Sequence, residues 1–94
     1  MLVAAEEVEL FEASHKYTLA ITREDEWVIR TPLKELEAQL DPARFWRVHR
    51  SAIVRVGAVA RVSRGGDGQV VVHFRNLERK VAVSRAYAHR FRTL

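Results

Sequence analysis

Two short runs near the N-terminus, residues 8–11 and 17–22, alternate apolar and polar side chains, and a third run, residues 27–30, begins with three apolar side chains. In the second run, Tyr17, Leu19 and Ile21 recur at every second position, which is the period of a half-buried strand. A polar loop separates the first two runs, and a charged turn separates the second from the third. The pattern predicts an antiparallel meander.

The period then changes from two to that of a helix over residues 31–40. Thr31 can cap its start and Pro32 suits its first position. The apolar stripe consists of leucines at helical spacing, namely Leu33, Leu36 and Leu40. Proline disfavours helical geometry in the residue before it, so Asp41-Pro42 ends this short helix.

The rest of the chain consists of β-branched and aromatic runs, at residues 45–48, 53–56, 59–63, 69–75 and 80–83. Glycine-rich residues 64–68 predict a tight hairpin turn, and residues 76–78 a second turn. A final helical turn is predicted from Ser84, with Tyr87, Phe91 and Leu94 on one stripe. The whole pattern predicts a mainly β fold of antiparallel strands with one short helix.

Size and composition bound the possible functions. The chain has 94 residues, 48% of them hydrophobic, and no cysteine. This predicts a single domain over residues 1–94 without disulfides, in keeping with a cytoplasmic protein. No apolar run approaches the length of about 20 residues that spans a bilayer, so no membrane association is expected.

Charge is unevenly distributed along the chain. Residues 1–43 carry four basic and ten acidic side chains, a net charge of −6, whereas residues 44–94 carry twelve basic and two acidic ones, a net charge of +10. The second half is therefore suited to an acidic partner, above all nucleic acid, because arginine and lysine neutralise phosphates.

The sequence contains no recognisable catalytic or metal-binding motif. The four histidines, His15, His49, His73 and His89, are scattered and lack metal-ligand spacing. The glycine cluster lacks the Lys-Ser/Thr of a phosphate-binding loop. We therefore expect no enzyme activity, no metal site and no cofactor.

Two segments place multi-donor side chains just past an apolar strand: Phe45 to Ser51 and Val81 to Arg85. Arginine is suited to bidentate contact with guanine, and serine and histidine can hold phosphates. Other roles stay open at this point, because Arg47 could pair with an acid of the N-terminal half and His49 could be a core histidine.

In combination, four segments resemble the LytTR family of DNA-binding domains in order and spacing. They are Glu12-Ala13-Ser14 with Tyr17, residues 31–37, residues 45–54 around His49-Arg50-Ser51, and residues 81–87 around Ser84-Arg85. The resemblance extends from about Val8 to Leu94. It implies an elongated stack of small antiparallel sheets whose strand-end loops enter successive major grooves of double-stranded DNA.

Carried over by position, the resemblance implies two sets of contact residues. The candidates for base contacts are Arg50, Arg85, Tyr17 and His15. The candidates for phosphate contacts are Lys16, Ser14, Arg47, His49, Ser51, Ser84 and Arg55. Arg55 departs from the family pattern, which often has a small polar residue there, and its added charge could contact a phosphate or equally form a surface ion pair. Which residue of the loop 14–18 reaches a base is left open.

The resemblance also implies a setting in transcription regulation. Family members usually follow a receiver domain in a response regulator of a two-component system, and they bind paired direct repeats. We therefore expect a bacterial protein that is monomeric when free and binds DNA as two copies. Two other functions stay open: an RNA- or single-strand-binding β-module, which needs exposed aromatic rings, and a basic protein-interaction domain.

Overall fold

The computed structural model describes residues 4–91, and their fold is mainly β. The strands are β1 (Val8–Ser14), β2 (Tyr17–Thr22), β3 (Glu26–Ile29), β4 (Phe45–His49), β5 (Ala52–Arg55), β6 (Val59–Arg64), β7 (Val70–Phe74) and β8 (Lys80–Val83). The helical elements are η1 (Ala5–Glu7), α1 (Leu33–Gln39), η2 (Val56–Ala58) and η3 (Arg85–Phe91). The predicted fold class is confirmed.

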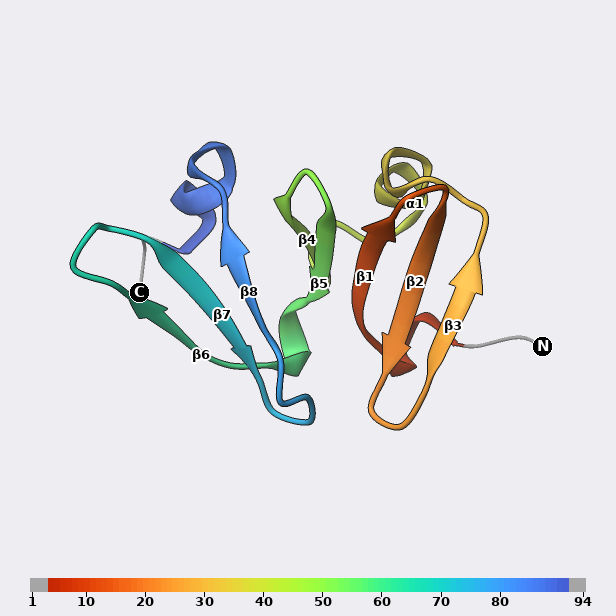
Figure 1. Ribbon diagram of the computed structural model, residues 1–94. Helices are drawn as coiled ribbons and strands as arrows, with labels where there is room; N and C mark the ends of the chain where they lie inside the picture. The colour runs from red at the N-terminus through yellow and green to blue at the C-terminus, as the bar shows by residue number, and fades with distance from the viewer. Residues whose placement is uncertain (1–3, 92–94) are drawn as a thin grey trace.

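The strands form two antiparallel sheets that lie one after the other along an elongated molecule (Figure 1). The five-stranded sheet has the order β3-β2-β1-β5-β4, and the three-stranded sheet has the order β6-β7-β8. The molecule measures 41 × 25 × 24 Å. Its N-terminal meander, predicted from the alternating pattern, is confirmed as β1-β2-β3.

Both faces of the five-stranded sheet are covered. The paired residues Phe11 and Ile53 point to the face that packs against α1, whereas Leu10 and Val54 point to the face that packs against the three-stranded sheet. The half-buried character predicted for residues 17–22 is therefore wrong. Thr18, Ala20 and Ile21 are all buried, since each face of the sheet has its own cover.

Several predicted boundaries need correction. The helix begins at Leu33, and Pro32 occupies its N-cap position without a side-chain cap. Thr31 does not cap it; its carbonyl instead accepts a hydrogen bond of 2.8 Å from Thr18 Oγ1. β1 continues to Ser14, so the predicted polar loop shrinks to a two-residue turn. The final helical turn is 3-10, and Leu94 lies outside the described residues.

A buried ion pair within the five-stranded sheet is linked by a hydrogen bond to the three-stranded sheet. Arg55 Nη2 lies 2.6 Å from Glu9 Oε2, and Arg55 Nε donates to the carbonyl of Val8 at 3.0 Å. Asn76, in the turn after β7, donates to the other Glu9 oxygen at 3.2 Å. The Glu9 side chain is only 2% exposed. Charged groups at this depth require such partners, so the three residues help to fix the orientation of the sheets.

Candidate nucleic-acid interface

The three predicted contact regions lie along one long edge of the molecule. Figure 1 shows the β1–β2 turn, the β4–β5 turn and the end of β8 directed to the same side, at the top of the view. Backbone hydrogen bonds connect them laterally: Ala13 N donates to Ser51 O at 2.9 Å, and Ser84 N donates to Val48 O at 2.9 Å. The structure thus brings together segments that are up to 70 residues apart in the chain.

The first turn presents exposed polar side chains. Ser14 pairs with Tyr17, so only His15 and Lys16 form the loop. His15 has a φ of 51°, a left-handed conformation that suits a two-residue hairpin and that histidine adopts more readily than most residues. His15 and Lys16 are exposed, and Tyr17 is 48% exposed. All three side chains are accessible to a ligand along this edge.

The second turn carries Arg50 on a backbone that is held by hydrogen bonds from Arg47. Arg50 is exposed. Arg47 Nε donates to the carbonyl of His49 at 2.9 Å and Arg47 Nη2 donates to the carbonyl of Arg50 at 2.6 Å, while its Nη1 pairs with Glu37 at 2.8 Å. The Arg47 side chain is only 13% exposed. These bonds favour the ion-pairing alternative for Arg47 over the predicted phosphate contact.

His49 is oriented by Ser51 rather than enclosed in the core. Ser51 N donates to His49 Nδ1 at 3.1 Å, and Ser51 Oγ lies 2.8 Å from the same nitrogen. Because Nδ1 accepts the amide hydrogen, the neutral ring carries its proton on Nε2. The half-buried ring can therefore donate one hydrogen bond from Nε2, as a phosphate contact requires.

The third turn places Arg85 directly after β8. Arg85 is exposed and Ser84 is half-buried. Gln69, at the β6–β7 hairpin, donates from Nε2 to the carbonyl of Val83 at 3.0 Å, which holds the backbone immediately before Ser84. A polar pocket of about 340 Å³ lies between this turn, the hairpin and His49. The sequence predicted the hairpin but not the role of Gln69, because that contact is tertiary.

Arg55 forms an ion pair, one of the two roles predicted for it, although its partner is buried and not at the surface. Its guanidinium faces Glu9 and Val8, and it lies at the end of β5 away from the β4–β5 turn. Gly57 leaves room for it, since a Cβ there would come within 3.1 Å of Arg55 Nη1. The structure therefore supports ion pairing for Arg55 and gives no reason to assign a phosphate contact.

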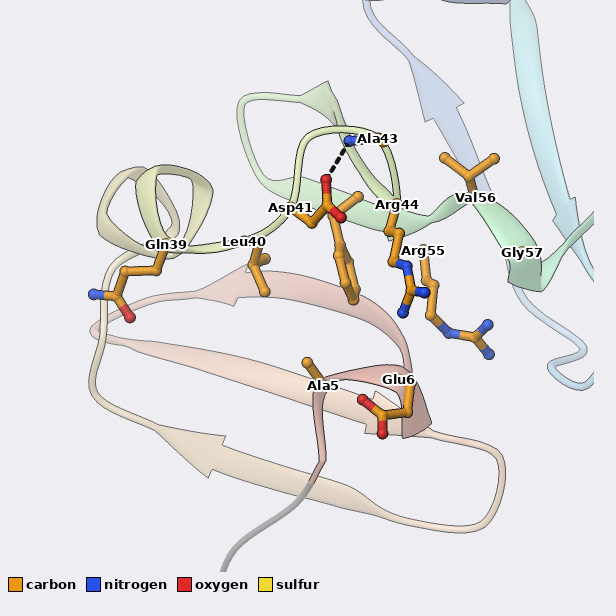
Figure 2. Close-up of a pocket in the computed structure, with 11 residues that line it drawn as sticks. Ala5, Glu6, Gln39, Leu40, Asp41, Ala43, Arg44, Arg55, Val56 and Gly57 are labelled. Carbon is orange, nitrogen blue, oxygen red and sulfur yellow. Dashed lines mark hydrogen bonds between the residues drawn. The ribbon is translucent and has the colours of Figure 1, made fainter.

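A second pocket of about 440 Å³ is separate from the contact edge (Figure 2). It lies where η1, the end of α1 and the end of β5 meet, and its lining includes Ala5, Leu40 and Phe45. Asp41 Oδ1 accepts a hydrogen bond of 2.9 Å from Ala43 N at its rim. None of the three strand-end turns lines this pocket.

Residues 4–91 contain no group of three or more histidine or acidic side chains arranged to hold a metal ion. Within the same part of the chain, no helix is long and apolar enough to cross a membrane.

His73 lies on the outer face of the three-stranded sheet, away from the contact edge. Its Nε2 is 2.8 Å from Ser63 Oγ. Partial burial, followed by the nearby positive charges of Arg61 and Lys80, lowers the pKa of His73 below its usual 6.5. The folded chain thus favours the neutral ring.

Acidification is expected to destabilise the chain through His73. The unfolded chain binds more protons below about pH 6.5. The stabilisation is therefore complete above this pH and is lost as the pH falls through the lowered pKa. Melting temperatures between about pH 8 and pH 5 should fall less steeply for His73→Gln than for the parent. Parallel curves for the two proteins would contradict this assignment.

An elongated β fold that presents arginine, lysine and histidine on strand-end turns defines a loop-based nucleic-acid-binding domain. The comparison with family models agrees: the model of the LytTr DNA-binding domain matches residues 1–94. The chain belongs to this family, which is not enzymatic, and membership implies DNA binding in transcription regulation.

Bacterial relatives support the same assignment. The chain is 40% identical over 96 residues to an uncharacterized response regulatory protein of Vibrio cholerae, with 97% of this chain and 36% of that protein covered. It is 34% identical over 77 residues to the positive alginate biosynthesis regulatory protein of Pseudomonas aeruginosa, with 82% and 31% covered. The chain thus spans about a third of the length of these relatives.

A solved structure has the same fold. It is the LytTr DNA-binding domain of a putative methyl-accepting/DNA response regulator from Bacillus cereus, with a TM-score of 0.89 and 29% identity. The similarity covers 98% of this chain and 84% of that one.

Proposed function

We propose that the chain binds double-stranded DNA sequence-specifically by inserting its strand-end turns into successive major grooves. The observation that carries this proposal is the lateral connection of the three turns along one edge, through Ala13–Ser51 and Ser84–Val48. Arg50 and Arg85 are the exposed arginines of the second and third turns. Arginine pairs with guanine O6 and N7 in the major groove, so these two residues are our candidates for base readout.

The arrangement of the turns suits contacts spread along a duplex. The Ala13–Ser51 bond places the first turn beside the second, and the Ser84–Val48 bond places the third turn on the other side of the second. His15 or Tyr17 would reach a base from the first turn, and Lys16, Ser14, His49, Ser51 and Ser84 would hold phosphates.

We propose a setting for this activity from the family and its relatives. The chain acts as the output domain of a cytoplasmic two-component response regulator, behind a receiver domain. It is monomeric when free and occupies paired direct repeats as two copies. The Vibrio cholerae relative, a response regulatory protein, supports the first part, since this chain corresponds to 36% of its length.

Selection from a randomised duplex library tests the proposal. Sites recovered with the purified chain at two salt concentrations are expected to share a motif in repeated half-sites. Binding should weaken as salt rises, because phosphate contacts release counterions. Salt-sensitive binding without an enriched motif would contradict sequence recognition and would favour the basic protein-interaction domain.

Competition with single strands tests the other alternative. A stacking platform needs exposed aromatic rings. The predicted core aromatics instead pack within or against the two core clusters, at Trp27, Phe45, Trp46, Phe74 and Phe91. Among residues 4–91, Tyr17 is the one exposed large aromatic side chain. Single-stranded oligonucleotides should therefore compete poorly with a duplex of the same sequence, and effective competition would overturn the duplex assignment.

A further inference from the structure

The outer face of the three-stranded sheet carries a row of basic side chains. Val70, Val72 and Phe74 of β7 are buried, so the alternate residue His73 faces outward. His73 pairs with Arg61 on β6 and with Lys80 on β8. These three residues, Arg61, His73 and Lys80, form the basic row, in which neighbouring strands are about 4.8 Å apart.

The basic row has no acidic counterpart on its own sheet face. By register, the other outward residues of the sheet are Ser63, Val71 and Ala82, none of them acidic. Arg61 and Lys80 are exposed. The ion pairs among residues 4–91 engage Arg47, Arg55 and Arg79 instead.

Among residues 4–91, no ion pair of this arrangement stabilises the free domain. Arg61 and Lys80 lie on either side of His73, two strand spacings or about 10 Å apart. Burial, followed by the charges of Arg61 and Lys80, lowers the pKa of His73. An anion lying across the three strands would be attracted by both positive charges and would meet up to three hydrogen-bonding side chains.

We propose that the basic row binds the phosphate backbone of DNA that continues past the third turn. This inference rests on the proposed function. β8 leads from Lys80 directly to Ser84 and Arg85, a distance of about 13 Å at 3.3 Å per strand residue. A duplex that bends towards the sheet reaches the row, and the added contacts offset the cost of bending.

Binding to a short and a long version of the same duplex tests whether the basic row contacts DNA. The short duplex ends at the last enriched base pair on the Arg85 side, and the long duplex continues for about 10 further base pairs, one helical turn. The parent chain is expected to bind the long duplex more tightly and with a steeper salt dependence. The double variant Arg61→Gln/Lys80→Gln should lose this gain, with the salt slope reduced by about 1 for each residue.

A matched control distinguishes an effect of the basic row from an effect of the overall charge of the protein. Arg23→Gln/Arg44→Gln removes the same charge from exposed positions outside the row and the strand-end turns, and it should keep the gain from the longer duplex. Base preference should be unchanged in both double variants. The melting temperature of Arg61→Gln/Lys80→Gln should match that of the parent, since among residues 4–91 neither side chain forms an ion pair that the substitutions would break.

The outcomes distinguish this inference from the proposed function. A shared motif combined with an undiminished length effect in Arg61→Gln/Lys80→Gln would overturn the role of the row alone, and an acidic protein partner would then be the better candidate. An equal loss in the Arg23→Gln/Arg44→Gln control would overturn it as well. Failure to enrich any motif would overturn the proposed function first.

Discussion

Replacing Arg55 with alanine is expected to lower the free energy of unfolding by about 3 kcal/mol, the lower end of the range for breaking a buried ion pair. The substitution leaves the Glu9 carboxylate, 2% exposed, without its cation. The loss falls at the lower end because Arg55 is itself 24% exposed and Asn76 still donates to Glu9. Urea denaturation of the parent and the variant measures the difference.

A second ion pair, which like the first involves a glutamate of β1, is the matched control. Arg79 pairs with Glu12 of β1 at 2.7 Å, but the two side chains are 40% and 29% exposed. Exposed pairs contribute about 0 to 1 kcal/mol, so Arg79→Ala should have little effect. Equal losses for Arg55→Ala and Arg79→Ala would show that the burial of Glu9 is not what makes the pair important.

A double variant separates the pair from its packing. Replacing a buried ion pair with apolar residues of similar volume is often nearly neutral. Glu9→Leu/Arg55→Met should therefore recover most of the stability lost in Arg55→Ala. If the double variant is as unstable as Arg55→Ala, the lost packing of the arginine side chain, and not the unpaired charge of Glu9, accounts for the loss of stability.

The sequence predicts the local elements well because they depend on nearby residues. Alternation predicts β1 and β2, a short apolar run predicts β3, the leucine spacing predicts α1, and the glycine cluster predicts the β6–β7 hairpin. The burial of Thr18 and Glu9 escaped prediction. Alternation is the pattern expected of a sheet with one buried face. The second face of this sheet is buried by the three-stranded sheet, whose residues come much later in the chain.

Long-range polar contacts explain why the predicted site needs revision. Arg55 and Glu9 are 46 residues apart, and Gln69 and Val83 are 14 apart. Nothing in the residues around Arg55 indicates a buried partner, so a phosphate contact and an ion pair were equally compatible with the sequence. The three strand-end turns could be located by resemblance to the family, but their lateral connection is visible only in the structure.

Replacing Arg85 with alanine is expected to weaken DNA binding by about 1 to 3 kcal/mol, with the loss concentrated at one base position. Arg85 is exposed, and the backbone before it is held by Gln69 and by the Ser84–Val48 bond. A guanidinium on a fixed backbone can make the bidentate contact that distinguishes guanine. Titration of duplexes carrying each base at that position measures the change in preference.

Comparing the binding losses of Arg85→Ala and Lys16→Ala shows whether Arg85 contacts a base or a phosphate. Lys16 is exposed in the first turn, and a phosphate contact there should contribute equally to every sequence, so its loss should weaken all duplexes alike and reduce the salt slope by about 1. Arg85→Lys sharpens the comparison, because lysine keeps the charge but lacks the planar fork that contacts two acceptors at once. If Arg85→Ala weakens all sequences uniformly and Arg85→Lys restores the affinity, Arg85 holds a phosphate. Base readout at the third turn must then come from another residue.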